Sequence, residues 1–176
     1  MPGFNICGIG EGPSAKVETR RVYRWVFTVL AEGIFTPDML LVLQSAMRPN
    51  FKFEEPEMHH QQEQAYFAGK QSWEPITLTW YDTEQSPDVS EALWNWIQSV
   101  SNFEAGTQNA PCVATPAEYK KDGILDMLNG CGVASERWKI CNAWPKESNW
   151  GNLDYVSTDI ATIEVQMRYD RAYRQF

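Results

Sequence analysis

The sequence lacks any apolar run of the length that a membrane helix needs, about 18 residues. Its first residues, MPGFNICGIGEG, lack the basic start and the apolar centre of a signal peptide. These absences argue against stable membrane insertion and against secretion by a cleaved leader. We therefore expect a protein that is made and kept in the cytoplasm, or released from it by lysis.

Cysteine and histidine are scarce. The four cysteines, at positions 7, 112, 131 and 141, form no Cys-x-x-Cys pair, and the two histidines lie far from them in the sequence. Zinc sites need closely spaced thiolate and imidazole ligands, so we expect no metal site. Idle thiols are the expected state in a reducing compartment, while a disulfide between two of the four stays open.

Positive charge is also scarce: 15 Lys and Arg stand against 23 Asp and Glu, a formal net charge of −8. An acidic chain does not hold phosphate backbones by charge, so ordinary nucleic-acid binding is disfavoured. The segment GIGEG lacks the spacing of a dinucleotide loop, and no Walker loop, Gly-x-Ser-x-Gly or His-Glu-x-x-His occurs. The sequence therefore predicts no enzyme, no catalytic residue and no cofactor.

Carboxylates and aromatic side chains are what the sequence has in plenty. Glu54, Glu55 and Glu57 lie close together, as glycosidase carboxylates do in space, but among 23 acidic residues a solvated face is the better interpretation. Aromatic residues make up 13% of the chain, with eight tryptophans. Aromatics beyond the needs of a core often lie in interfaces or ligand grooves. An assembly surface and a sugar-stacking tryptophan platform are both open at this point.

The apolar pattern predicts mainly strands, and the cleanest alternation is at residues 76–81 and 160–169. Apolar runs at 21–30, 39–43, 51–58, 123–128 and 137–144 are also interpreted as strands. Asn129-Gly130, followed by Gly132, predicts a hairpin turn longer than two residues. One helix is predicted at about 86–100, with Ser86 or Asp88 as its cap. Short strands with one helix indicate an antiparallel β-sandwich or half-barrel. We expect one domain over 1–176, with residues 1–18 as an extended N-terminal arm.

The stretch EMHHQQEQAYF holds both histidines, His59 and His60. Neighbouring residues on a strand point to opposite faces, so these two cannot bind one metal from a regular strand. The polar segment HHQQEQ is flanked by two strand-like segments, which is typical of a hairpin tip. We therefore predict a projecting hairpin or loop over about residues 46–73.

The order of several motifs resembles the tail tube proteins of contractile-tailed bacteriophages. The second half reads PAEYKKDGILDMLNGCGVASERWKICNAWPKESNWGNLDY and then IATIEVQMRYDRA, and the first half has AGKQSWEPITLTWYD followed by DVSEALWNWI. The resemblance covers roughly residues 20–174. It implies a tail tube fold, related to the tubes of type VI secretion and contractile injection systems.

The resemblance also implies a structural role in the virion. Such proteins form hexameric rings that stack into a hollow tube inside a contractile sheath. The implied partners are further copies of the chain, the tail sheath protein, and the baseplate and tail terminator proteins. Genomic DNA would pass down the bore without specific binding, and assembly would take place in the host cytoplasm.

Two sets of residues are the candidate contacts within such a tube. The hairpin tip is expected to reach a neighbouring subunit or the next ring through Met58, His59, His60, Gln61, Gln62, Tyr66 and Phe67. The polar face of the last strand is expected to line the bore through Thr162, Glu164 and Gln166, with Thr77 and Thr79 facing either the bore or a neighbour. A tube initiator or baseplate relative, a tube of a DNA-free injection system and a tryptophan-based carbohydrate-binding sandwich remain as alternatives.

Overall fold

The structure is a computed structural model that describes residues 20–60, 63–84, 88–101 and 115–176, with only the backbone described at Val29 and His60. The strands are β1 (Trp25–Leu30), β2 (Leu43–Ala46), β3 (Phe51–Phe53), β4 (Glu57–His60), β5 (Glu63–Tyr66), β6 (Gln71–Trp73), β7 (Ile76–Tyr81), β8 (Lys121–Leu128), β9 (Ala134–Asn149), β10 (Thr162–Arg168) and β11 (Arg171–Arg174). The helices are α1 (Pro37–Leu41), α2 (Val89–Val100) and α3 (Pro116–Tyr119). The extended N-terminal segment expected at 1–18 and most of the loop expected at 101–117 lie outside the described residues.

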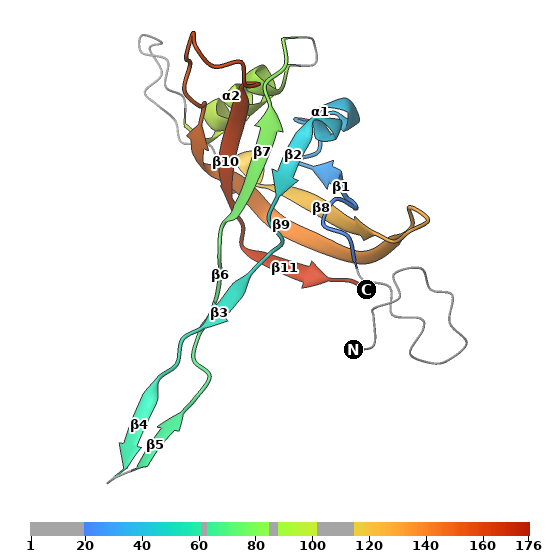
Figure 1. The fold of residues 1–176 in the computed structure, drawn as a ribbon. Helices are drawn as coiled ribbons and strands as arrows, with labels where there is room; N and C mark the ends of the chain where they lie inside the picture. The colour runs from blue at the N-terminus through green and yellow to red at the C-terminus, as the bar shows by residue number, and fades with distance from the viewer. Residues whose placement is uncertain (1–19, 61–62, 85–87, 102–114) are drawn as a thin grey trace, which may run out of the picture.

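Seven strands form one antiparallel sheet in the order β1-β8-β9-β10-β7-β2, with β11 beside β9. The long strand β9 belongs to both halves of this sheet. Its first part pairs with β8 and β11, and its last part pairs with β10. The sheet therefore curves around β9 into an open half-barrel (Figure 1). The predicted antiparallel half-barrel is confirmed.

Strand β9 turns sharply at Asn142, whose φ is 58°. Asparagine tolerates this left-handed conformation better than most residues. The turn is held from two sides, because the Asn142 backbone N–H donates to Asp122 Oδ1 at 3.1 Å and its Nδ2 donates to Asp170 Oδ2 at 2.9 Å. The sequence predicted a strand over 137–144 only, so the full length of β9 was missed.

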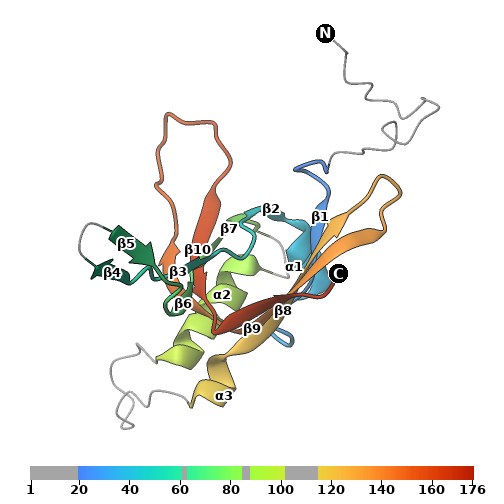
Figure 2. The same ribbon diagram turned by 90° about the horizontal axis from the view of Figure 1, so that it is seen from below.

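The core lies inside the curve of the sheet, where α2 sits between its two halves (Figure 2). The alternation predicted for β7 and β10 is confirmed, since one face of each strand is at most 1% exposed. These buried residues are Ile76, Leu78, Trp80, Ile163, Val165 and Met167. Phe35 stacks on Trp80 with ring centroids 5.5 Å apart and meets the edge of Trp96 at 5.8 Å. Aromatic packing thus joins the sheet to α2.

Helix α2 forms where the apolar spacing predicted it. The side chain of Asp88 caps its N-terminus by accepting the Ser90 N–H at 2.8 Å. Val89, Leu93 and Trp96 fall on one face of the helix and are buried against the core. The Trp96 Nε1 also donates to the Tyr119 carbonyl in α3 at 2.8 Å, which satisfies this buried polar group.

The predicted turn between β8 and β9 is confirmed, and it is longer than two residues. Asn129 organises it, because its Oδ1 accepts the N–H groups of Cys131 at 2.9 Å and Val133 at 3.0 Å. Gly132 has a φ of 78°, a conformation that glycine adopts without steric cost.

Three strand predictions are wrong in detail. The segment predicted as one strand at 51–58 is divided between β3 and β4, because residues 54–56 are not in a strand. The apolar run at 39–43 is mostly helical: α1 begins at Pro37, whose fixed φ suits a first turn, and buries Met39 and Leu40 while Leu41 is exposed. In β1 a register shift between Phe27 and Val29 breaks the alternation expected over 21–30. Phe27 and Leu30, three positions apart, are therefore both buried.

Candidate functional site

A long β-hairpin, here called the arm (residues 51–73), leaves the rest of the described chain, the body, between β2 and β7 (Figure 1). It consists of two short ladders, β3 with β6 and β4 with β5. Between the ladders the two sides of the hairpin pass close to each other, and the Gly69 N–H donates to the Glu54 carbonyl at 2.6 Å. A Cβ at position 69 would come within 2.7 Å of that oxygen, so the crossing requires glycine.

The arm exposes apolar side chains that the body does not cover. Phe51, Phe53, Met58, Tyr66 and Phe67 are each 49–61% exposed. Only the root of the arm joins the core, through Phe51 against Trp73 and Trp73 against Tyr169, with ring centroids 5.4 and 5.8 Å apart. An exposed apolar surface of this kind is a candidate contact with another molecule.

The structure places the predicted tip residues on β4, β5 and the residues that follow. Met58, Tyr66 and Phe67 are exposed, while His60 is described only by its backbone pairing with Glu63, and Gln61 and Gln62 lie outside the described residues. His59 makes two local contacts: its Nε2 lies 3.4 Å from Glu57 Oε2 and its Nδ1 lies 3.3 Å from Gln64 Nε2. The histidine is thus engaged within the hairpin, and the role of the tip as an inter-subunit contact stays a prediction.

The residues predicted to line a bore lie on one polar face of the sheet, opposite the core. On β10, Glu164 stands beside Thr79 of β7 and Asn149 of β9. Directly opposite residues in a ladder share a face. The face therefore comprises Ser45, Thr77, Thr79, Tyr81, Trp144, Glu147, Asn149, Thr162, Glu164, Gln166 and Arg168. It carries two carboxylates and one arginine, and the Ser45 Oγ donates to the Thr79 Oγ1 at 3.0 Å.

Three strands of the body leave an edge without a partner within the described chain. β1 pairs only with β8, β2 pairs only with β7, and β11 pairs only with β9. Unpaired edges present rows of N–H and C=O groups that pair readily with another chain. The edges of β1 and β2 lie at the two ends of the sheet order, so they mark where the half-barrel is open.

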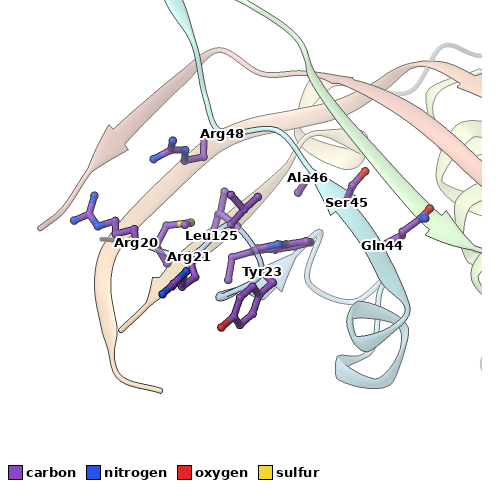
Figure 3. A pocket seen from close by; sticks show the side chains of 11 residues that line it. Arg20, Arg21, Tyr23, Gln44, Ser45, Ala46, Arg48 and Leu125 are labelled. Atoms are coloured by element: carbon purple, nitrogen blue, oxygen red, sulfur yellow. The ribbon is translucent and has the colours of Figure 1, made fainter. Parts of the chain in front are cut away.

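A groove of about 470 Å³ lies at this opening, between the start of β1 and the end of β2 (Figure 3). Three arginines line it, Arg20, Arg21 and Arg48, together with Tyr23 and Trp25. The rest of the lining is Val22, Gln44, Ser45, Ala46, Leu125 and Met127, so no carboxylate faces the groove among the described residues. In a chain of net charge −8 this is a local positive surface.

A buried carboxylate orients two of these arginines. The side chain of Glu136 is 4% exposed and forms an ion pair with Arg20. Arg48 NH1 lies 3.9 Å from Glu136 Oε1, and Arg174 NH2 lies 3.8 Å from Oε2. The Trp138 Nε1 donates to the same carboxylate at 2.5 Å. Three arginines around one carboxylate leave an excess of positive charge at the rim of the groove.

A second buried carboxylate, Asp126, holds the sheet below the groove. It accepts from Arg137 Nε at 2.6 Å and NH2 at 2.7 Å, and from Thr28 Oγ1 at 2.7 Å. The hydrogen bonds from Arg137 lower the pKa of Asp126 despite the opposing effect of burial. This pair joins β8 to β9 and, through Thr28, to β1.

The connection between β9 and β10, residues 150–161 and here called the end loop, projects from the body at the end opposite the arm (Figure 1). Leu153, Tyr155, Val156 and Ile160 in it are 69–109% exposed. The motif GNLDY contributed to the family resemblance, but this exposed surface was not predicted from the sequence. The sequence signal for this exposed surface was the presence of four apolar residues in a segment without the alternation of a strand.

Two other kinds of feature, a metal site and a membrane-spanning helix, are not found within residues 20–60, 63–84, 88–101 and 115–176. There, no three His, Cys, Asp or Glu side chains come together as metal ligands, and no helix has the length and hydropathy to span a membrane. Cys131 and Cys141 are free thiols, while Cys7 and Cys112 lie outside the described residues.

The tryptophans do not form a flat platform. Trp80 and Trp96 are buried, and the exposed pair, Trp94 and Trp150, meets edge to face with ring planes at 62°. This pair therefore presents two inclined ring faces and not one flat platform.

A family model described as T4-like virus tail tube protein gp19 matches residues 45–172. The match spans most of the chain, from β2 to β11. The chain belongs to this tail tube family. The family is one of structural proteins of phage tails, and the resemblance found in the sequence is thereby confirmed.

Further comparisons agree with membership of the tail tube family. A tail tube protein of Serratia phage KSP90 is 22% identical over 159 residues, which is 87% of each chain. Among solved structures, the sheath/tube terminator of an extracellular contractile injection system has a TM-score of 0.66 at 20% identity, covering 92% of this chain and 99% of its own. The sheath–tube complex of such a system gives 0.63 at 21% identity, covering 89% and 91%. At these identities the solved structures show the shared fold, which agrees with the half-barrel described above.

Proposed function

We propose that copies of this chain form hexameric rings that stack into the inner tube of a contractile phage tail, the conduit through which the genome is ejected. The observation that carries this proposal is the incompleteness of the isolated chain. Three strands of its sheet, β1, β2 and β11, have an unpaired edge, and its arm exposes five large apolar side chains.

The free edges of β1 and β2 support ring formation. A contact between two different surfaces of identical subunits closes into a ring when the rotation allows it. If β-strands of neighbouring copies meet at these edges, one continuous barrel forms and the edges of β1 and β2 are both covered. The half-barrel is open where such a contact would close it.

The arm supports contacts beyond one subunit. It is too far from the body to bury Met58, Tyr66 and Phe67, which keep more than half of their surface exposed. In the proposed tube these residues, with His59, His60, Gln61 and Gln62, reach a neighbouring subunit or the next ring. Burying each large apolar side chain there would contribute about 1.5–3 kcal/mol.

The polar face of β10, β7 and β9 suits the wall of a DNA channel. Each phosphate held by a Lys or Arg adds affinity and would slow the passage of the genome. Thr162, Glu164 and Gln166 offer no such cation, and the face as a whole has more carboxylates than arginines. In the proposed tube this face lines a bore with a net negative charge and no continuous basic stripe.

The partners follow from this role. The solved relatives include a sheath–tube complex and an anti-feeding prophage cap that terminates its tube. We propose that this chain likewise meets a tail sheath protein, a baseplate and a terminator, and that it assembles in the host cytoplasm without stable membrane insertion.

Negative-stain microscopy of the purified chain tests the proposal. We expect rings or tubes, either spontaneously or after a baseplate is supplied. A variant in which a short turn replaces residues 58–69 should keep a folded body, because that segment contributes no core residue, but should fail to stack. A parent chain that stays monomeric at high concentration with a baseplate present would contradict the proposal.

A tube initiator, or the tube of a DNA-free injection system, would share this architecture. The genes that neighbour this one distinguish these possibilities, because only a phage tail is encoded beside capsid and genome-packaging genes.

A further inference from the structure

The end loop presents an acidic and apolar surface without any cation. Residues 150–161, WGNLDYVSTDIA, contain two aspartates and no Lys or Arg. Leu153 is 93% exposed, Tyr155 109% and Val156 88%. The loop is shaped by its own hydrogen bonds: Asp154 Oδ1 accepts the Val156 N–H at 3.0 Å, and Asp159 Oδ2 accepts from the Ser157 hydroxyl at 2.8 Å. These apolar side chains are thus held out into solvent.

The groove of Figure 3 presents the complementary surface. Its lining combines Tyr23 and Trp25 with three arginines and no carboxylate among the described residues. Arg20 and Arg48 are already oriented by Glu136. The Arg21 side chain makes no ion pair within the part of the chain that the structure describes, so its charge is available to an incoming carboxylate.

The two surfaces lie at opposite ends of the same strands. At one end of β7, Tyr81 pairs with Thr162, the residue that follows the end loop. At the other end, Met47 donates to the Thr77 carbonyl at 3.0 Å, and Arg48 follows just before the arm begins. Copies stacked head to tail along this axis therefore bring the end loop of one towards the groove of the next.

We propose that the end loop of one copy docks in the groove of the copy stacked on it, with Tyr155 and its apolar neighbours against Tyr23 and Trp25 and with Asp154 and Asp159 facing the arginines. This contact rests on the proposed tube and names the surfaces that join its rings. The apolar side chains supply the burial, and the charges fix the direction, because a loop cannot dock on another acidic loop.

Assembly of full-length variants tests the contact. Tyr155→Ser and Arg21→Glu should each leave single rings intact but prevent stacking, or raise the concentration at which tubes form by at least about tenfold, as loss of a hot-spot residue does. Arg21→Glu combined with Asp154→Arg exchanges the two charges and should restore tubes. Negative-stain counts of rings and tubes, with sedimentation, give both readouts.

Two matched controls show that the effect is local. Val133→Ser removes an exposed apolar side chain from the β8–β9 turn, and Lys146→Glu reverses an exposed cation outside the groove. Both should form tubes like the parent. Circular dichroism melting of all variants should match the parent, because Arg21 and Tyr155 are exposed in the isolated chain.

The outcomes separate this contact from the tube itself. If the parent forms no rings or tubes, the proposed function falls and the contact with it. If Arg21→Glu and Tyr155→Ser stack normally, or if they lose rings as well as tubes, the contact is wrong while the tube stands. If the parent binds a short DNA duplex at low salt and Arg21→Glu loses that binding without losing tubes, the groove holds nucleic acid instead of the loop.

Discussion

The body and the arm use the same kinds of side chains for different purposes. In the body, Trp80 is fully buried and packs on Phe35. In the arm, Phe53 is 49% exposed, and its ring meets the ring of Phe51 at a centroid distance of 5.5 Å. Aromatic side chains therefore stabilise the fold in the body and remain exposed in the arm. Amino-acid composition does not distinguish a core aromatic from an exposed one. The surrounding sheet does, because Trp80 lies in the seven-stranded sheet and Phe53 lies in a two-stranded ladder.

Replacing a core aromatic should have the largest effect on stability. We expect Trp80→Ala to lower the free energy of unfolding by about 3–5 kcal/mol, because a large cavity remains at the centre of the sheet. Phe53→Ala in the arm should cost less than about 1 kcal/mol and should impair assembly instead. Urea denaturation of both variants measures the difference, and equal costs would show that the arm belongs to the folding unit.

Neutralising Asp126 should have a smaller effect. Asp126→Asn leaves Arg137 without its charged partner and should cost about 2 kcal/mol at pH 7. The pKa of Asp126 is lower in the folded chain than in the unfolded one. Its contribution is therefore present above the unfolded pKa of about 4 and is lost as the pH falls through the folded value.

Urea denaturation of the parent and of Asp126→Asn between pH 7 and pH 3 tests this expectation. The gap in stability between them should be constant from pH 7 to about pH 5 and should narrow below about pH 4. A gap that widens in acid would mean that another group controls the pH dependence.

Changing the crossing of the arm should have the smallest effect on stability. Gly69→Ala forces the two sides of the hairpin apart, since the new Cβ would lie 2.7 Å from the Glu54 carbonyl oxygen. We expect the global unfolding free energy to change by less than about 0.5 kcal/mol, because no core residue is involved. Hydrogen exchange should become faster at amides of the arm and remain unchanged in β7 and β10. Faster exchange in the body would show that arm and body are coupled.

Elements with local signals were predictable from the sequence. The alternation in β10, the Asp88 cap and the Asn129 turn each depend on residues a few positions apart. The length of β9 was not predictable, because it follows from the bend at Asn142, which is held by Asp122 and Asp170 from distant segments. The groove was not predictable for the same reason. Arg21 and Arg48 line one groove only because the folded sheet places β1 and β2 at its two ends. The polar face of β10 followed from its alternation, while its place on the wall of a bore stays part of the proposed function.

The arm leaves the body at one end only, while the end loop projects from the other (Figure 1). A filament built from such subunits is polar, in the way that a row of arrows is. One terminus displays arms and arginine grooves, and the other displays acidic loops. In the proposed tube, the two termini therefore present different surfaces, and a capping protein that fits one does not fit the other.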